Sequence, residues 1–587
     1  MARVIWDGEK IVVDSSRLDT ECLDALSAKY GGERLPLSDF YQFPRSRETI
    51  MQIGALSGIV MDLSFEKLYS KVVRSEERKE TELRERIAGL DLPGRMYVFQ
   101  KEAVVTMLDY SDNGRNVLLA SAPGCGKSCM TSVYLSKKAG AYPCLLICPA
   151  SLKTNWAMEI QKWSPGVKTY ILEGRSSYEQ PSVVASAKNA DVVITNYDIL
   201  GIEDKTAREK EEMRIAEAKE NGRKYRKAFI PVKGWAGVFA GFGFRTVVCD
   251  ECQYIESSKA VRTRAVIQIC SDKRIRKVFL SGTPFETKLK RFYNACHILA
   301  PDLFPKESEF LFRYCAPKKT YFGWTFDGVS NLEELRRKLS LFMIRHRKED
   351  VLSQLPAKQK IPVYFGMNAS SRKLYDDMEE ELMSRKDKMH QFSYIAEMRK
   401  ALMEIKKEVV YQYVKDMLEV EGKIVVFVYH VGMYDFLMEK FKGIAVGING
   451  SVAAVKRQAA VDKFQKTDKI RLFIGQIGAA STGLTLTASH TLIFAEFGQT
   501  AAQMEQASDR IHRIGQESDS CQIYYLVLKD TIDEAPIRTL SSHYTDIDKV
   551  MDGGSGTEFV DFGSQMMAWV KDKRLMRQKK GISIEYE

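Results

Sequence analysis

The sequence has no run of about 18 consecutive apolar residues, the length from which a helix can span a bilayer. Its first residues also lack the apolar segment and small-residue cleavage site of a secretory signal. Most of the 11 cysteines stand inside apolar stretches, which is typical of a reducing compartment. We therefore expect a soluble intracellular protein without a membrane partner. It would be cytoplasmic or at the nucleoid in a bacterium or phage, and nuclear in a eukaryote.

Thiols arranged for metal binding are also missing. One C-x-x-C pair is present, Cys249-Asp250-Glu251-Cys252, but no second pair and no nearby histidine accompany it. A structural zinc site usually needs four such ligands. A zinc site is therefore not expected, and the two carboxylates between the thiols need another explanation.

The length and charge of the chain limit its architecture and its partners. With 587 residues it is too long for one hydrophobic core, and about three or four structural units are expected. Hydrophobic residues make up 45% and charged residues 28%, as in soluble globular proteins. The formal net charge of +11 favours a polyanionic partner.

A glycine-rich segment follows the apolar run Val117-Leu118-Leu119 and precedes helix-forming sequence. Strand, glycine turn, Lys-Ser and helix is the order of a nucleotide phosphate loop, whose backbone N–H groups surround phosphate oxygens. Lys127 would contact the β- and γ-phosphates of ATP, and the Ser128 hydroxyl would bind Mg²⁺. The strict pattern has a glycine where this chain has Ser121. The other loop residues expected at the nucleotide are Pro123, Gly124, Cys125 and Gly126.

An Asp-Glu pair ends a second apolar stretch, residues 246–249. Such a strand would place both carboxylates at the sheet edge where the phosphate loop lies. Asp250 would hold Mg²⁺ through water, and Glu251 would orient and deprotonate the attacking water.

Two arginines near the carboxyl terminus complete the chemical pattern. Arg510 and Arg513 are three residues apart, so on a helix they would share a face. Arginines that face a γ-phosphate across a cleft stabilise transition-state charge and can raise a rate by about 10³–10⁵. Both are predicted to be catalytic, together with Lys127, Asp250 and Glu251.

Apolar stretches divide the chain into two α/β lobes. The strands expected in the first lobe are 116–120, 144–148, 191–195, 246–249 and 277–281. Those expected in the second lobe are 423–428, 471–475, 491–495 and 522–528. The predicted organisation is an N-terminal accessory domain with a hairpin near its start, a first lobe, helical insertions and linker, a second lobe and a basic tail. Their respective bounds are 1–90, 91–300, 301–420, 421–540 and 541–587.

The motifs taken together resemble helicase superfamily two, specifically the Swi/Snf-type double-stranded-DNA translocases. The resemblance runs in family order from about residue 97 to about residue 533. It implies two tandem RecA-like lobes, parallel sheets flanked by helices, with helical insertions and a small accessory domain. It implies a DNA-stimulated ATPase with ATP and Mg²⁺ as cofactors, Gln100 and Gln506 at the nucleotide, and Ser128 and Asp250 at the metal. The DNA contacts that it implies are Ser151, Lys153, Asn155, Trp156, Asn196, Tyr197, Ser481, Thr482 and Thr485.

A finer resemblance links the chain to the annealing-helicase (HARP-type) subgroup. It is carried by the segments Arg313-Tyr314-Cys315, Gly323-Trp324, 331–335, 350–359 and Phe494-Ala495-Glu496. That subgroup rewinds complementary strands and remodels forked or branched DNA, and it usually needs an accessory module. Residues 1–90 occupy the place of such a module, either as a packing domain or for substrate recognition.

The chain departs from the family at Ser121-Ala122, at Cys252-Gln253 and at 498–500. None of these changes removes a residue that phosphoryl transfer requires. Gln516 after Gly515 disfavours the RNA-helicase branch. The alternatives are a strand-separating DNA or RNA helicase, a nucleosome remodeller and an inactive DNA-binding scaffold. We expect a monomer that binds double-stranded or branched DNA.

Overall fold

The structure is a computed structural model of the 587-residue chain. It describes residues 2–541 and residues 566, 569 and 570. The gaps within the first range are 7–8, 15–22, 25–26, 28–31, 36–39, 45–46, 57–58, 222–228, 283–287, 322, 348–355, 385–387, 453, 481–483, 514 and 519. The predicted basic tail lies outside the described residues except for Ser541 and those three. Two compact units meet in the sequence between Val105 and Thr106.

The first unit contains a five-stranded sheet in the order β3-β4-β2-β1-β5. Its strands are β1 (Ala2–Trp6), β2 (Lys10–Asp14), β3 (Glu33–Arg34), β4 (Phe40–Pro44) and β5 (Ile59–Met61). The antiparallel pairing of Val4 with Val13 confirms the predicted hairpin. Alternate residues of β2, Ile11 and Val13, are buried because successive side chains of a strand point to opposite faces. They pack beside Phe65 of α3 (Leu63–Gly89).

The second unit contains a sheet of seven strands in the order β14-β6-β11-β10-β7-β9-β8, and every pairing in it is parallel. We call the region around this sheet the first lobe. Its strands are β6 (Val117–Leu119), β7 (Cys144–Cys148), β8 (Thr169–Ile171), β9 (Val192–Asn196), β10 (Thr246–Asp250), β11 (Arg276–Leu280) and β14 (Met343–Ile344). The central strands are buried along their whole length, as the uninterrupted apolar runs predict.

A second parallel sheet of six strands, ordered β15-β20-β19-β16-β18-β17, defines the second lobe. Its strands are β15 (Ala357–Phe365), β16 (Ile424–Val428), β17 (Ala445–Ile448), β18 (Leu472–Gln476), β19 (Thr491–Phe494) and β20 (Ser520–Leu528). Residues of β16 alternate between two cores: Val425 packs with helix residue Phe464, and Val426 packs with helix residue Val414. Two tandem α/β lobes with parallel sheets confirm the predicted RecA-like fold class.

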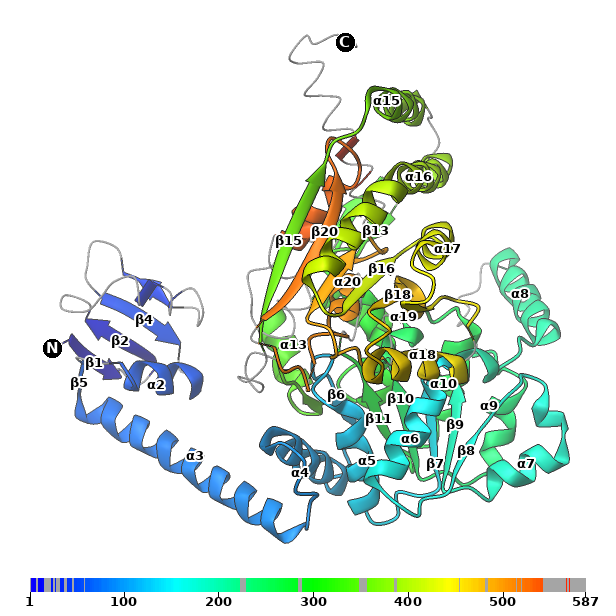
Figure 1. The fold of residues 1–587 in the computed structure, drawn as a ribbon. Helices are drawn as coiled ribbons and strands as arrows, with labels where there is room; N and C mark the ends of the chain where they lie inside the picture. The colour runs from blue at the N-terminus through cyan, green and yellow to red at the C-terminus, as the bar shows by residue number, and fades with distance from the viewer. Residues whose placement is uncertain are drawn as a thin grey trace. The chain divides into compact units, whose positions relative to one another are not determined.

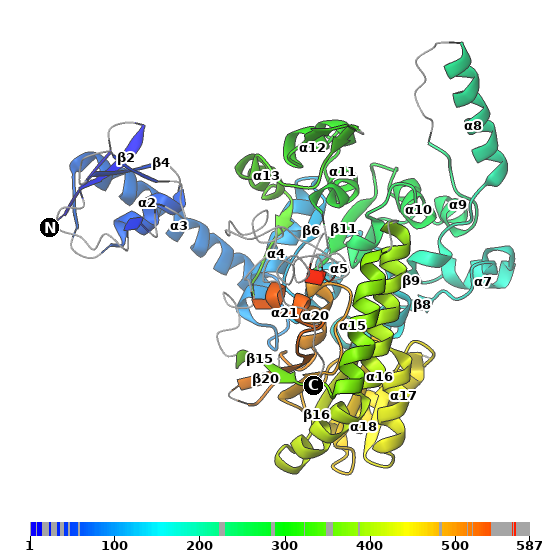
Figure 2. The ribbon, with the colours of Figure 1, turned by 90° about the horizontal axis from the view of Figure 1, so that it is seen from above.

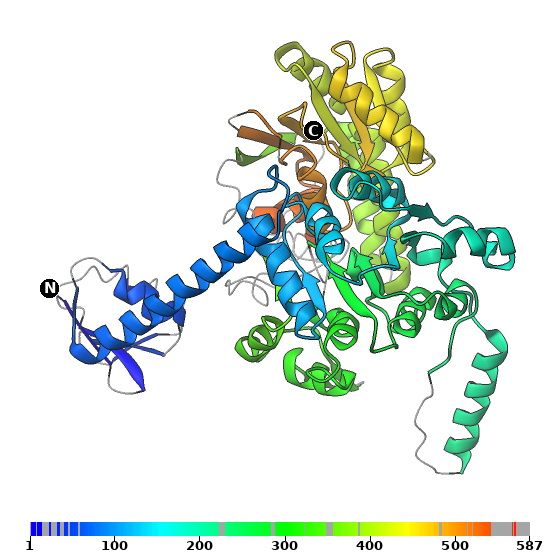
Figure 3. The ribbon, with the colours of Figure 1, turned by 90° about the horizontal axis from the view of Figure 1, so that it is seen from below.

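Helices of the first lobe flank its sheet. They are α5 (Lys127–Lys137), α6 (Lys153–Trp163), α7 (Pro181–Lys188), α8 (Lys205–Glu220), α9 (Trp235–Val238), α10 (Val261–Ile269), α11 (Tyr293–Leu299), α12 (Glu307–Tyr314) and α13 (Leu332–Leu339). α4 (Val98–Asp112) leads from the first unit into this lobe, and α2 (Arg47–Gly54) belongs to the first unit. α8 projects from the lobe (Figures 2 and 3), and residues 222–228, shortly after its end, lie outside the described part.

The second lobe carries α15 (Ala369–Ser384), α16 (Lys388–Val420), α17 (Val431–Lys440), α18 (Ala454–Lys466), α19 (Ile477–Ala480), α20 (Ala501–Ser508) and α21 (Glu534–Ser541). α15 and α16 run side by side, and α16 also contacts α17 (Figure 2). Among the described residues, no helix is both long and apolar enough to cross a membrane.

The region over 301–420, predicted as helical insertions and linker, also contains strands. β14 pairs with β6 at one edge of the first sheet, and β15 pairs with β20 at the edge of the second (Figure 1). β15 escapes a search for apolar runs because it is an edge strand whose residues alternate between exposed and half-buried, and Pro362 is tolerated only at such an edge. The nine predicted strands of the two lobes are present, and β8 and β17 are additional.

Candidate active site

The glycine-rich loop connects β6 to α5, as the sequence predicts. β6 is fully buried, and α5 begins at Lys127. Gly124 and Gly126 have φ of 87° and 84°, a left-handed conformation in which a side chain would be strained. The loop therefore needs glycine at both positions to turn its N–H groups inward. Pro123 and Ser128 are half-buried on either side of these glycines, whereas Cys125 is fully buried.

Lys127 lies over the loop that precedes it. Its Nζ donates hydrogen bonds to the carbonyl oxygens of Ser121 and Ala122, at 2.9 and 3.5 Å. Burial lowers the pKa of Lys127, and the nearby Glu251 carboxylate opposes that shift. The ammonium group is thus held between the loop and the acidic pair, where the phosphates of a nucleotide would lie.

Ser121, the residue that departs from the strict loop pattern, has its own contact. Its hydroxyl lies 2.9 Å from Nδ1 of His346, and the His346 carbonyl accepts a hydrogen bond from Ala122 N. The next residue toward β14, Arg345, donates to the Ala120 carbonyl at 2.8 Å. The end of β14 therefore holds the start of the phosphate loop. A glycine in place of Ser121 has no side chain and could not contact His346.

The loop also contacts the segment after β11. A Cβ on Gly282 would come within 2.7 Å of the Pro123 ring, so only glycine allows this close approach. Ser281 and Gly282 directly follow β11, and the next residues, Thr283 and Pro284, lie outside the described residues.

Asp250 ends β10 and is buried, with 7% of its surface exposed. Its Oδ2 accepts a hydrogen bond of 2.8 Å from Trp156 Nε1, and its Oδ1 accepts one of 3.0 Å from Glu251 N. Burial and then repulsion by Glu251 raise the pKa of Asp250 to about 7, although the indole hydrogen bond opposes this. A divalent cation bound to the Asp250 carboxylate would restore its ionised form.

A magnesium ion would fit the donors gathered here. Among the described residues, no group of three or more His, Cys, Asp or Glu side chains is arranged to hold a metal. Mg²⁺ in nucleotide sites instead keeps several waters and takes few protein ligands besides phosphate oxygens. The Asp250 carboxylate and the Ser128 hydroxyl, on neighbouring elements, are a donor set of that kind.

Glu251 is held by side-chain amides from both lobes. Gln253 Nε2 donates to its Oε2 at 2.9 Å, and Gln506 Nε2 donates to its Oε1 at 3.1 Å. Gln253 in turn accepts a hydrogen bond of 2.7 Å from the Ser281 hydroxyl. Glu251 itself has φ of 52°, a strained conformation for a residue with a side chain. Gln506, predicted at the nucleotide, here contacts the expected general base.

The two arginines do not lie on a helix, in contrast to the prediction. α20 ends at Ser508, and Arg510 and Arg513 follow it in a turn. They nevertheless converge, because both donate to the Leu484 carbonyl, at 3.4 and 3.2 Å. Burial and then repulsion by Arg513 lower the pKa of Arg510 to about 10.

Arg513 also reaches toward the first lobe. Burial lowers the pKa of Arg513, and Glu159 of α6 opposes this shift. Its Nη1 donates to the Thr485 hydroxyl at 3.1 Å. Thr485, predicted to contact DNA, thus contacts an arginine of the active site. Ser481 and Thr482, from the same predicted motif, lie outside the described residues.

Lys358 of β15 is a functional candidate that the sequence reasoning missed. Its Nζ donates to Glu505 Oε1 at 2.6 Å and to Ser508 Oγ and Asp509 Oδ1, both at 2.9 Å. Burial alone would lower the pKa of Lys358, but Asp509 and Glu505 raise it. His512 Nε2 lies 2.8 Å from the Pro356 carbonyl. β15 thereby holds the turn that carries both arginines.

Three of the predicted DNA contacts are buried inside the first lobe. Trp156 and Tyr197 are each 1% exposed, and the Tyr197 hydroxyl donates to the Asp250 carbonyl at 2.7 Å. Lys153 is also buried, and its Nζ contacts the Leu172 carbonyl and the Glu173 carboxylate. The DNA contacts of these three side chains stay predictions.

The other predicted contacts have mixed surroundings. Ser151 and Asn155 are half-buried, and Asn196 is buried with 6% of its surface exposed. Gln100 is buried in the first unit, where its Oε1 accepts a hydrogen bond of 3.1 Å from Tyr97 N. That bond caps the start of α4, and the predicted nucleotide contact of Gln100 stays a prediction.

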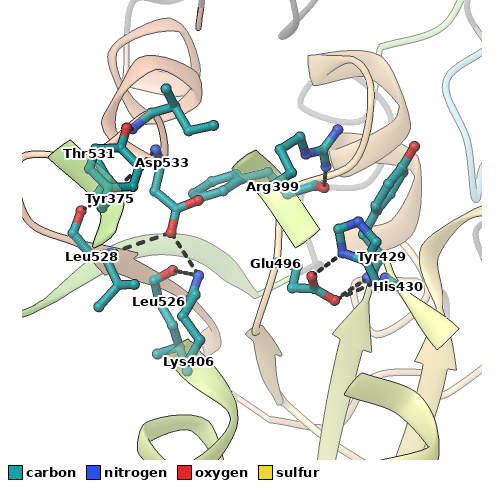
Figure 4. Close-up of polar contacts among 12 residues, drawn as sticks. Tyr375, Arg399, Lys406, Tyr429, His430, Glu496, Leu526, Leu528, Thr531 and Asp533 are labelled. Atoms are coloured by element: carbon teal, nitrogen blue, oxygen red, sulfur yellow. Dashed lines mark hydrogen bonds and ion pairs between the residues drawn. The ribbon is translucent and has the colours of Figure 1, made fainter. Parts of the chain in front are cut away.

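A second polar cluster lies at the carboxyl edge of the second sheet (Figure 4). Glu496 follows β19 and accepts hydrogen bonds from Tyr429 N, His430 N and His430 Nδ1, at 2.9, 3.0 and 2.6 Å. The Arg399 guanidinium stacks on the Tyr429 ring, 4.0 Å from its centroid. Glu496, part of the segment resembling annealing helicases, therefore fixes the ends of β16 and β19 to each other.

Beside this cluster, Lys406 of α16 is buried and contacts Asp533 Oδ2 at 2.9 Å and the Leu526 carbonyl at 2.7 Å (Figure 4). The pair joins α16 to the segment that follows β20. It is a structural contact of the second lobe, remote in sequence from the phosphate loop.

Comparison with known families decides the identity of the chain. The SNF2-related domain matches residues 99–414, more than half of the chain. The chain belongs to the SNF2-related family. The helicase conserved C-terminal domain matches residues 405–515, which span most of the second lobe. These SNF2 domains imply the use of ATP, in agreement with the phosphate loop.

Several curated relatives resemble this SNF2-related chain. A SWI/SNF-related matrix-associated actin-dependent regulator of chromatin subfamily A-like protein 1 from Xenopus tropicalis is 30% identical over 480 residues, 78% of this chain and 46% of the relative. The DNA annealing helicase and endonuclease ZRANB3 from Homo sapiens is 30% identical over 458 residues, 75% of this chain and 39% of the relative. The chain thus spans less than half the length of either protein. The name of the second relative agrees with the resemblance to annealing helicases.

Among solved structures, the Sulfolobus solfataricus SWI2/SNF2 ATPase core in complex with dsDNA matches with a TM-score of 0.35 and 19% identity. The match covers 83% of this chain and 97% of that one. The ATPase core domain of the same organism also matches with a TM-score of 0.35, at 18% identity.

Proposed function

We propose that the chain is a DNA-dependent ATPase that moves along duplex DNA and reanneals or remodels forked and branched DNA. The observation that carries this proposal is the hydrogen bond between Gln506 of the second lobe and Glu251 of the first. It brings the expected general base, the phosphate loop and the two arginines to one place. A binding scaffold would have no need for that convergence.

In the proposed reaction, Lys127 holds the β- and γ-phosphates of ATP and the loop N–H groups surround them. Mg²⁺, held by Ser128 and Asp250, would neutralise charge on the phosphate oxygens. Glu251 orients a water molecule and accepts its proton as the oxygen attacks the γ-phosphorus and the bond to the β-phosphate oxygen breaks. Arg510 and Arg513 stabilise the negative charge of the transition state.

Movement would follow from the same contacts. Glu251 and both arginines engage the nucleotide only when the two lobes approach each other. Hydrolysis and release of phosphate therefore remove contacts that hold the two lobes together. DNA contacts on each lobe would then alternate, and such contacts to phosphate carry little sequence information. Our proposed DNA contacts are Ser151, Lys153, Asn155, Trp156, Asn196, Tyr197, Ser481, Thr482 and Thr485. The predicted domain at 1–90 would recognise the DNA structure, and we propose that the protein acts as a monomer inside the cell.

ATP hydrolysis measured with linear duplex, forked, gapped and single-stranded DNA of equal length tests the proposal. We expect duplex and forked DNA to stimulate turnover more than single strands do. Lys127→Ala should abolish turnover and leave DNA binding intact. Lys137→Ala, at the end of the same helix, should not abolish turnover. Stimulation by single strands alone would indicate a strand-separating helicase instead, and near-normal turnover of Lys127→Ala would contradict the enzyme assignment.

A further inference from the structure

A small hairpin between α12 and α13 forms a sheet of its own. Its strands are β12 (Lys318–Thr320) and β13 (Gly323–Thr325). Isolated two-stranded hairpins are marginally stable in water. Here Phe312 of α12 packs edge-on against Trp324 and Phe326, with ring centroids 5.1 Å apart in each pair. Aromatic contacts therefore hold the hairpin to the first lobe, and β13 is labelled in Figure 1.

The outer surface of this hairpin is unusually aromatic. Tyr321, at its tip, is 97% exposed, and Trp324 and Phe312 are 50% and 47% exposed. The register pairs Trp324 with Lys319, so these two side chains lie on the same face. Contiguous exposed aromatic side chains generally mark a binding surface, whereas scattered single ones do not.

The charge of the hairpin selects the kind of partner. Lys318 and Lys319 are exposed, and within the described part of the chain neither forms an ion pair. Asp327 is already paired with Lys288 and Lys290, at 2.8 and 3.0 Å, and these hydrogen bonds lower its pKa. The surface is therefore positive beside its aromatic side chains. Protein interfaces are depleted in lysine, whereas surfaces that bind single strands combine aromatic side chains with basic ones.

We propose that this hairpin binds DNA at positions where bases are unpaired, such as a fork junction or a strand end. Tyr321 and Trp324 would stack on exposed bases, and Lys319, on the same face as Trp324, would contact an adjacent phosphate, whereas Lys318 lies on the opposite face beside Thr325. The bases of an intact duplex already stack on one another, so an aromatic side chain gains a contact only where pairing ends. The proposal rests on the DNA-dependent function above and adds to it the element that recognises a junction.

The test compares the affinity of the full chain for a fork and for a linear duplex that share the same sequence. The Tyr321→Ser, Trp324→Ser double variant should bind the fork about tenfold more weakly and the linear duplex within about twofold of the wild type. Its ATPase activity at saturating linear duplex should be unchanged. Tyr364→Ser is the matched control, since Tyr364 is 44% exposed on β15, a strand of the second lobe's sheet.

Two further variants separate stacking from charge. Tyr321→Phe, Trp324→Phe keeps both aromatic faces and should bind forks as the wild type does. Lys319→Gln should reduce the dependence of log Kd on log salt by about 0.7 to 0.9, as expected for one lost phosphate contact. If the double serine variant loosens the hairpin, Tyr321→Ser alone remains informative because that side chain is almost fully exposed.

Unchanged fork affinity in the serine variants would overturn the proposal and point to a protein partner for this surface. Equal losses on fork and linear duplex would also overturn it, because junction recognition would then be absent. A wild-type chain that no DNA stimulates would instead contradict the proposed function, and the direct binding measurement would still report on the hairpin. The two failures are therefore distinguishable.

Discussion

Gln506 Nε2 donates a hydrogen bond of 3.1 Å to Glu251 Oε1, although the two residues are 255 positions apart in the chain. Glu251 follows β10 of the first lobe, and Gln506 lies on α20 of the second. Because Gln253 holds the other oxygen of the same carboxylate, the proposed general base has a fixed orientation only while the lobes are together. Approach of the two lobes is thereby linked to ATP hydrolysis.

Gln506→Ala should lower kcat for ATP about tenfold and leave the KM for ATP within about threefold, because the lost contact orients the base rather than the nucleotide. Steady-state ATPase assays with saturating DNA measure both constants. The control is Gln503→Ala on the same helix, whose Oε1 accepts a hydrogen bond from Gln499 N within the second lobe. A loss confined to KM would mean that Gln506 binds the nucleotide, as the sequence resemblance implies.

Trp156→Phe should shift the acidic limb of the pH–rate profile upward by about one unit. The indole donates a hydrogen bond to the ionised Asp250, which favours the charged form, so its removal raises an Asp250 pKa that already lies near 7. Turnover, which needs the ionised carboxylate for Mg²⁺, is then lost at a higher pH. The profile is measured at limiting Mg²⁺, and excess Mg²⁺ should restore part of the activity.

A matched variant for this experiment is Trp163→Phe. Trp163 lies on the same helix and donates its indole N–H to Glu159 at 2.9 Å. Its profile should stay at the wild-type position. An unshifted profile for Trp156→Phe would remove the positioning role of that indole, and a reduced DNA affinity would support the predicted DNA contact of Trp156.

Lys358→Met should lower both stability and turnover. The substitution leaves Asp509 and Glu505 without the cation that they share, and loss of one partner of a buried ion pair costs about 3–5 kcal/mol of unfolding free energy. Thermal unfolding measures the first effect. The DNA-stimulated kcat, measured below the unfolding transition, reports whether the turn that carries Arg510 has moved.

Lys360→Met serves as the comparison, because Lys360 is only partly buried and contacts Glu505 alone, at 3.1 Å. It should change stability by about 1 kcal/mol or less. Lys358→Arg retains the charge and should restore stability more fully than turnover. A planar guanidinium does not reproduce three converging ammonium contacts. Full turnover in Lys358→Met would refute the positioning role.

The sequence predicted those parts of the site that depend on short-range pattern. Uninterrupted apolar runs indicated the buried strands β7, β9, β10 and β16, and the glycines of the loop marked positions where φ is positive. It did not predict where α20 ends. The two arginines at helical spacing follow that helix, and what brings them together is a shared bond to the Leu484 carbonyl.

The sequence by itself determined the phosphate loop, the Asp-Glu pair and the alternation of strands and helices, because each depends on neighbours along the chain. Only the tertiary structure decided that Trp156 and Tyr197 hold Asp250 from within the first lobe. Only it showed that Lys358, on an edge strand with no apolar run, holds the arginine turn. These contacts join residues far apart in sequence, so no pattern among neighbouring residues predicts them.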